Sequence, residues 1–137
     1  RTGTRFESDA EREKYLKKVF MPIRRSVVKT LKEYGARLQD LSQDIYDELL
    51  IEDFSAYVEK LEETLLKASN KYTAEDCPDS LGPAVQWMRH SIAQAADGLD
   101  ELNLFLVNFD YDHLSMAENL FKIAIEHSKV ALNLTKV

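Results

Sequence analysis

The chain has 137 residues, of which 45% are hydrophobic and 31% charged, and its formal net charge is −6. This length suits one domain with a single core, and four glycines and three prolines are too few for a turn-rich β-sandwich. The single cysteine excludes an internal disulfide and favours a reducing, cytoplasmic location. No apolar run approaches the ~20 residues that are needed to span a bilayer.

Positive and negative charges are separated along the chain. Residues 1–37 hold 11 Lys or Arg against 5 Asp or Glu, whereas residues 38–137 hold 7 against 19. A basic segment of this kind is typical of proteins that bind nucleic acid, anionic membranes or acidic partners. Because an acidic body repels phosphate, we prefer the interpretation that the basic segment packs against the acidic remainder, in the same chain or in a neighbouring one.

The first predicted element is a basic helical segment within residues 1–21. Ser8 and Glu11 have the spacing of a capping box, which predicts a helix that begins near Asp9. Pro22 then either begins a second helix or kinks a single longer one. An apolar face with flanking cations is predicted to be a partner surface, made of Arg12, Tyr15, Leu16, Lys17, Val19, Phe20, Arg24 and Arg25.

The second element follows Pro22 and reaches to about residue 49. Its apolar residues recur at helical spacing, at Ile23, Val27, Leu31, Tyr34, Leu38, Leu41, Ile45 and Leu49. Neither Gly nor Pro separates this pattern from the next one, so a break between them rests on Glu52 and Asp53 alone. The alternative is one very long helix that continues through this point.

The third predicted helix covers residues 53–72, with Asp53 as its N-cap. Its apolar seam consists of Phe54, Val58, Leu61, Leu65, Ala68 and Tyr72. Residues 73–82 are rich in turn formers and are predicted to be a loop.

The clearest periodicity follows this loop. A heptad-like seam consists of Val85, Met88, Ile92, Ala95, Leu99, Leu102, Leu106 and Phe109. It predicts a helix over residues 83–107, in which Gly98 is a mild destabilising feature. A last helix is predicted over residues 112–135, with Asp112 as its cap.

Together these patterns predict an all-α fold. We expect an up-and-down four-helix bundle formed by residues 22–137, with an additional N-terminal helical segment at residues 1–21, in a single domain. The four amphipathic segments can close such a bundle with every apolar seam covered. Because the N-terminal segment offers a further apolar face, we expect the protein to form a homodimer or a larger oligomer.

No catalytic or metal-binding pattern is recognisable in the sequence. Di-iron bundles use paired Glu-x-x-His motifs, and neither His90 nor His127 follows a glutamate by three positions. His90 also lacks the Lys and Gly that usually follow the histidine of a phosphotransfer domain, and Cys77 has no CxxC partner. We therefore expect a protein that is not an enzyme and that needs no cofactor or metal.

His127 lies on the apolar stripe of the last predicted helix. We interpret it as a hydrogen-bonded core residue, and the alternative is a ligand for haem or a metal. Together with Trp87 it marks a possible small-ligand pocket between the helices.

Three functions are compatible with these observations. The preferred one is a non-enzymatic protein–protein interaction or oligomerisation module, because the apolar seams are rich and catalytic patterns are missing. The alternative is a basic-arm binder of nucleic acid or anionic membranes, and the third is a small-ligand sensor. We expect a protein partner, including a second copy of the chain, and no strong binding to nucleic acid.

Overall fold

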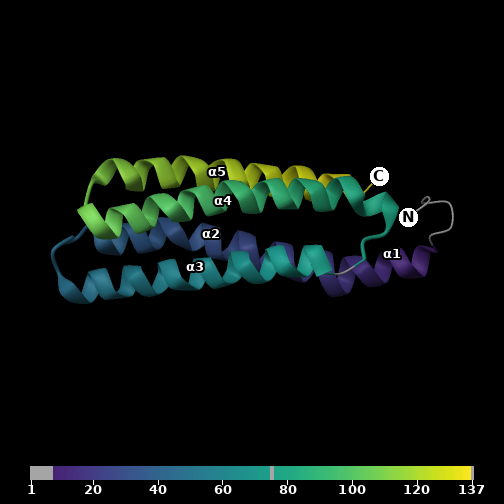
Figure 1. Ribbon diagram of the computed structural model, residues 1–137, viewed down its shortest axis with the longest axis horizontal. Helices are drawn as coiled ribbons and strands as arrows, with labels where there is room; N and C mark the ends of the chain where they lie inside the picture. Colours follow the sequence, from purple (N-terminus) through teal and green to yellow (C-terminus); the bar gives the residue numbers. More distant parts are fainter. Residues whose placement is uncertain (1–7, 75, 137) are drawn as a thin grey trace.

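The computed structural model, which describes residues 8–74 and 76–136, is a bundle of four long antiparallel helices (Figure 1). The helices follow one another around the core, because α2 contacts α3, α3 contacts α4, α4 contacts α5 and α5 contacts α2. The four are α2 (Met21–Leu41), α3 (Glu48–Ala74), α4 (Gly82–Asn108) and α5 (Tyr111–Leu134). The described ranges contain no strand, which confirms the predicted all-α four-helix bundle.

A helical extension precedes α2. It consists of α1 (Asp9–Tyr15) and one π-helical turn, η2 (Leu16–Phe20), and it runs into α2 without a break. Ser8 caps α1 as predicted, since its Oγ accepts a hydrogen bond of 3.1 Å from the Glu11 N–H. Pro22 lies one residue after the π turn, so the helix continues past a residue that has no N–H to donate. The second of the two predicted alternatives, one longer helix, is therefore correct.

The break between α2 and α3 lies at residues 42–47, so its predicted position at Glu52 and Asp53 was wrong. Two aspartates form the connection. The Asp44 Oδ1 accepts a hydrogen bond from the Tyr46 N–H, and the Asp47 Oδ1 accepts from the N–H groups of the first turn of α3 at 2.8 and 3.3 Å. This side-chain capping replaces Gly or Pro as the helix stop.

The connection between α4 and α5 is only two residues long. The Phe109 backbone is left-handed, with φ of 57°, and its N–H bonds to the Phe105 carbonyl at 2.7 Å. Asp110, not the predicted Asp112, caps α5, because its Oδ1 accepts from the Asp112 N–H at 2.9 Å. The turn also shifts the last seam position, so that Phe105 is fully buried and Phe109 is exposed.

The core contains most of the predicted seams. The third helix buries its complete seam, and α4 buries the predicted positions from Val85 to Leu102. The α4–α5 contact is especially close, since a Cβ at Gly98 would collide with the Phe121 ring. Gly98 is therefore required by the packing of these two helices. No helix within the described ranges is long and apolar enough to cross a membrane.

Candidate protein-binding surfaces

The apolar residues of the predicted N-terminal partner surface are buried inside the chain. Tyr15, Leu16, Val19 and Phe20 belong to the same core as the four long helices. The Tyr72 hydroxyl donates a hydrogen bond of 3.2 Å to the Phe20 carbonyl and so ties this segment to α3. This part of the prediction was wrong, because the bundle itself covers the apolar face that we expected a partner to cover.

Two of the predicted cations also act within the chain. Arg12 donates to the Thr135 carbonyl at 2.5 Å, and Arg24 donates to the Ser128 carbonyl at 3.0 Å. Both carbonyls lie near the C-terminal end of α5, where a cation also compensates the helix dipole. Burial lowers the pKa of the Arg24 guanidinium. Lys17 and Arg25 remain exposed.

The predicted pair Trp87 and His127 does come together in space. Their rings meet edge to face with centroids 5.2 Å apart, and His90 lies 5.6 Å from Trp87 and 6.4 Å from His127. The buried Nδ1 of His127 has no hydrogen-bond partner among the described residues, so the expected hydrogen-bonded core histidine is not what is observed. Trp87 and His127 are partly buried and His90 is exposed, so the three rings form a cluster at the surface of α4 and α5.

Metal ligation finds no support in the same part of the chain. Within residues 8–74 and 76–136, no three His, Cys, Asp or Glu side chains converge as a metal site would require.

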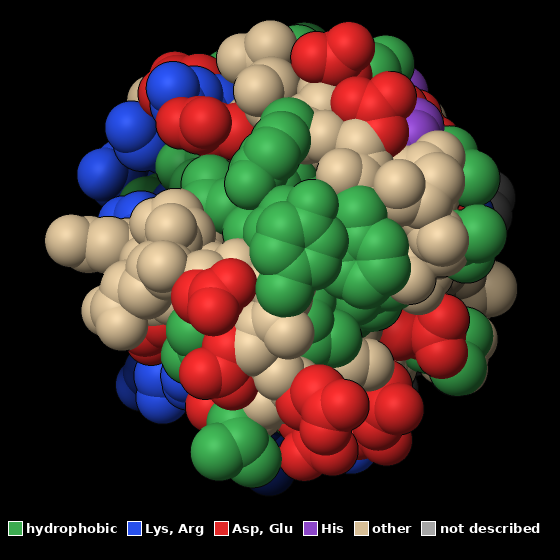
Figure 2. All heavy atoms as spheres, turned by 90° about the vertical axis from the view of Figure 1, so that its left-hand side faces the viewer, with side chains coloured by type: hydrophobic (Ala, Val, Ile, Leu, Met, Phe, Trp, Pro, Cys, Tyr) green, Lys and Arg blue, Asp and Glu red, His purple; other side chains and the backbone are tan. Residues whose placement is uncertain are grey.

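A different surface, at the end of the bundle where α3 and α5 begin and α4 ends, exposes hydrophobic side chains. Of the ten large hydrophobic side chains exposed in the described ranges, six belong to this end, with exposed fractions of 81% for Tyr46, 80% for Val107 and 71% for Leu49. Figure 2 shows hydrophobic side chains gathered at the centre of this end face. We define the apolar end as Tyr46, Leu49, Leu104, Val107, Phe109 and Tyr111.

A shallow hollow lies beside Tyr46 and Phe109 of the apolar end, and Glu48 and Glu52 are part of its wall. This hollow has a volume of about 310 Å³ and lies between the α2–α3 connection and Phe109, with Ile45, Tyr46 and Ile51 in its wall. The Phe109 ring packs edge to face on Phe105, with centroids 5.5 Å apart. A left-handed backbone is unfavourable for a bulky residue, and such strain concentrates at functional sites. Here it holds an aromatic ring at the rim of the hollow.

A polar network fixes the α4–α5 turn that carries Phe109. The His113 Nδ1 lies 2.8 Å from the Glu101 Oε2, and the His113 Nε2 lies 3.3 Å from the Asn108 Nδ2. The Asn108 Oδ1 also accepts a hydrogen bond of 2.9 Å from the Asp110 N–H. Both ring nitrogens of His113 are thus engaged, so the turn is held in one arrangement before any partner binds.

Two stretches of chain that reach the apolar end carry Asp and Glu but no Lys or Arg. Residues 38–59 contain seven Asp or Glu and no Lys or Arg, and residues 90–121 contain six Asp or Glu and no Lys or Arg. Figure 2 shows acidic side chains around the hydrophobic centre. These two cation-free runs were a sequence signal for this end, but their meeting in space depends on the antiparallel packing of the helices.

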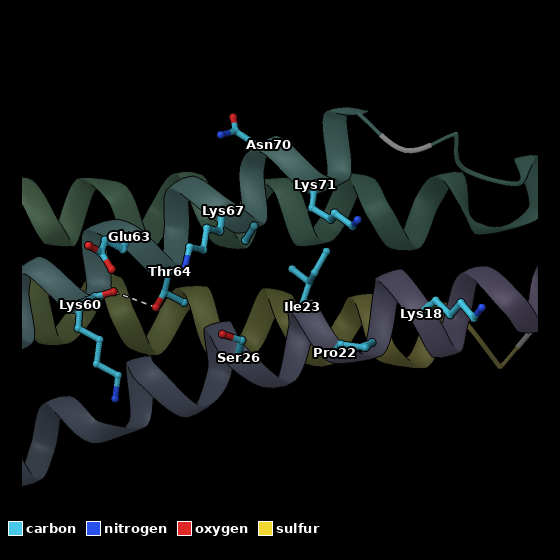
Figure 3. Close-up of a pocket in the computed structure, with 11 residues that line it drawn as sticks. Lys18, Pro22, Ile23, Ser26, Lys60, Glu63, Thr64, Lys67, Asn70 and Lys71 are labelled. Atoms are coloured by element: carbon cyan, nitrogen blue, oxygen red, sulfur yellow. Dashed lines mark hydrogen bonds between the residues drawn. The ribbon is translucent and has the colours of Figure 1, made fainter.

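A second hollowed surface runs along the bundle between α2 and α3, with a volume of about 840 Å³ (Figure 3). Its wall includes Lys18 from η2 and Lys60, Lys67 and Lys71 from α3. None of the predicted site residues lines it. Sequence reasoning missed it because its cations come from segments about 40 residues apart.

These features define a helical bundle with two candidate interaction surfaces. In a comparison with protein families, residues 7–136 match the family described as the cyanobacterial DnaJ chaperone, C-terminal domain. The match covers nearly the whole chain, and the chain belongs to this family. No curated protein and no solved structure is detectably similar to it.

Proposed function

We propose that the chain is a non-enzymatic protein-binding domain of a DnaJ-type chaperone, and that the apolar end makes the contact with the protein partner. The observation that carries the proposal is the concentration of exposed hydrophobic side chains at this end. Large exposed apolar patches that are rimmed by polar residues mark interaction sites. Membership of a chaperone family agrees with a protein as the ligand.

The charge around the apolar end selects the kind of partner. A hydrophobic segment with flanking Lys or Arg would match the acidic rim, and complementary charge increases both the association rate and the specificity. Two apolar ends facing each other would bring like charges together, so a symmetric end-to-end dimer is disfavoured. The proposed ligand is therefore a basic, hydrophobic segment of another protein.

The test is fluorescence anisotropy with a labelled peptide of alternating Leu or Phe and Lys residues. We expect Tyr46→Ser combined with Val107→Ser to weaken binding by about tenfold or more, because two exposed apolar contacts are lost. Leu66→Ser combined with Val130→Ser is the matched control, since it removes exposed hydrophobic side chains elsewhere. An equal loss in both double variants contradicts the proposal, and so does tighter binding of the same peptide with Glu in place of Lys if Tyr46→Ser combined with Val107→Ser weakens that binding.

Self-association is a second candidate function. The observation that favours it is the opposite charge of the acidic end and of the exposed cations on α2, among them Arg25, Lys29 and Lys32. A contact between the end of one copy and the side of another would be heterologous. The argument from a surplus N-terminal apolar face no longer applies, because that face is buried.

A further inference from the structure

The groove between α2 and α3 has an apolar floor. Pro22 and Ile23 contribute from α2 and Ala68 from α3. Figure 3 shows Ile23 directed from α2 toward α3, and Lys67 and Lys71 extending from α3 toward the groove. The groove is therefore a hydrophobic strip with cations along its side, and it is separate from the apolar end.

Two tyrosines define the length of the groove. The Tyr72 hydroxyl bonds to the Phe20 carbonyl at 3.2 Å, and the Tyr57 hydroxyl bonds to the Thr30 carbonyl at 2.7 Å. These hydrogen bonds fasten the two helices together at levels on either side of Ile23 and Ala68. Near the Tyr57 level, Lys60 bridges to Glu33 across the helix pair with an Nζ–Oε2 distance of 3.0 Å and closes the groove.

The spacing of the cations follows the groove. Lys60, Lys67 and Lys71 are separated by seven and four residues and so share one face of α3. On α2, Lys29 continues the line of the groove residues Pro22 and Ser26 at helical spacing. Four lysines and one carboxylate, Glu63, line the groove, and one of the lysines, Lys60, is already paired with Glu33. The segment from residue 60 to residue 71 is about 17 Å long at 1.5 Å per residue.

We propose that this groove binds an acidic amphipathic helix of a partner protein. A helix of about three turns matches the groove length. Its apolar stripe would cover Ile23 and Ala68, and its acidic flanks would face the lysines. This site is independent of the apolar end, so that either surface can fail its test without affecting the other.

A protein segment fits better than a nucleic acid or a membrane. A phosphate backbone gains nothing from the apolar floor, and it would meet Glu63 and the negative body of the chain. A membrane surface is broad, whereas this site is a hollow between two helices that is bounded at one end by the Lys60–Glu33 pair. The shape thus selects a single helix.

The direct test uses a fluorescein-labelled peptide designed as a three-turn amphipathic helix with Leu on one face and Glu on both flanks. At about 150 mM salt we expect measurable binding by anisotropy, and binding weaker by about tenfold or more for a scrambled peptide of the same composition. A scrambled peptide that binds equally well would overturn the proposal, because charge alone would then explain the binding. The absence of binding to the intact chain would also overturn it.

Two variants locate the site. Lys18→Glu combined with Lys67→Glu reverses charge at the groove, and Ser26→Trp places a large side chain in it without changing charge. We expect both to weaken peptide binding by about tenfold. The control is Lys122→Glu combined with Lys129→Glu on α5, which changes the net charge equally and should change binding by less than about twofold. Circular dichroism melting confirms that each variant is folded.

Competition experiments identify the occupant. Unlabelled duplex DNA, vesicles containing anionic lipid, and an excess of the Lys18→Glu, Lys67→Glu variant of the protein, whose own groove binds the peptide weakly, are each added to the peptide complex. We expect none of them to displace the peptide at concentrations at which unlabelled peptide does. Displacement by DNA or by vesicles would assign the groove to phosphates, and displacement by the protein would assign it to a second copy; either result would overturn the proposal.

Discussion

At the scale of single residues, the same amino acid has opposite roles at two positions. Gly98 faces the Phe121 ring so closely that a methyl group would collide with it, whereas Gly35 has no atom within 4 Å of an added Cβ. Both glycines lie inside helices, where glycine is less favourable than alanine. The intrinsic helix propensity is therefore the same at both glycines, and only the packing of a neighbouring helix distinguishes Gly98 from Gly35.

This difference gives the first prediction. We expect Gly35→Ala to raise the free energy of unfolding by about 0.5–1 kcal/mol, because helix propensity improves without a clash. Gly98→Ala should lower it by about 1–3 kcal/mol, because the Phe121 ring must move. Urea denaturation of both variants measures these changes. A stabilising Gly98→Ala would contradict the close approach of α4 and α5.

At the scale of secondary-structure elements, side chains decide where the helices end. The α2–α3 connection contains no Gly or Pro, and its geometry depends on the carboxylates of Asp44 and Asp47. Asp53, by contrast, lies inside α3, one turn beyond the actual start. The sequence therefore predicted the existence of a break but placed it too late.

The second prediction tests this boundary. Asp47→Ala removes a carboxylate that accepts two N–H hydrogen bonds at the start of α3, and we expect it to destabilise the protein by about 1 kcal/mol. Asp53→Ala should change stability by less than about 0.5 kcal/mol, because alanine is a better helix former than aspartate at an exposed interior position. Chemical denaturation compares the two variants. A larger loss for Asp53→Ala would restore the sequence-predicted boundary.

Three buried tyrosines link the helices to one another. The hydroxyls of Tyr34, Tyr57 and Tyr72 donate hydrogen bonds to carbonyls of another element. Burial is the main reason that the pKa of each of these hydroxyls is raised well above its usual range. Glu118 raises the pKa of Tyr34 further and Glu33 that of Tyr57, whereas Arg37 beside Tyr57 and Arg24 beside Tyr72 oppose the shift. The folded chain therefore holds these groups neutral under conditions in which an unfolded chain would ionise them.

The third prediction concerns alkaline pH. Because the folded-state pKa is above the unfolded value of about 10, the contribution of these tyrosines is complete below that pH and is lost as the pH rises above it. We expect the denaturant concentration at the unfolding midpoint to decrease as the pH rises above ~10. The ultraviolet spectrum should show the buried tyrosines ionising cooperatively over the same pH range. Tyr57→Phe should reduce this alkaline sensitivity. Ionisation of all tyrosines before any loss of helix would refute the prediction.

At the scale of the whole molecule, charge is distributed unevenly over the bundle. The α2–α3 and α4–α5 connections, which lie at the same end of the bundle (Figure 1), contain Asp but no Lys or Arg, whereas exposed lysines and arginines follow α1, η2 and α2. Arg12 and Arg24 attach the basic segment to α5 within one chain. Both contacts are to backbone carbonyls and not to Asp or Glu side chains, so the expected docking of basic on acidic residues stays a prediction.

The fourth prediction concerns assembly. If the acidic end of one copy contacts the basic side of another, we expect association that is strongest at low ionic strength and declines as salt screens the charges. Sedimentation velocity at low and high salt measures it. Reversal of Arg25 and Lys29 to Glu should abolish the association. A mass near 15.8 kDa at every salt concentration would exclude self-association.

Much of this fold was determined by the sequence itself, because helical periodicity is a local property. Apolar residues that recur every three or four positions must lie on one side of a helix, so the seams of α3 and α4 could be identified before any neighbour was known. The Ser8 cap and the helical character of the segment around Pro22 are equally local. Each of the four apolar stripes has to be buried against the other helices, and this need for burial predicted the bundle.

Only the tertiary structure decided where the interaction surfaces lie. Tyr46 and Phe109 are more than 60 residues apart and meet because two antiparallel connections reach the same end. The apolar face at Tyr15 and Phe20 was recognisable in the sequence, but the other helices cover it. Periodicity identifies which residues share a face, whereas exposure depends on which faces the remaining elements reach. The candidate sites therefore could not be read from the pattern that predicted the helices.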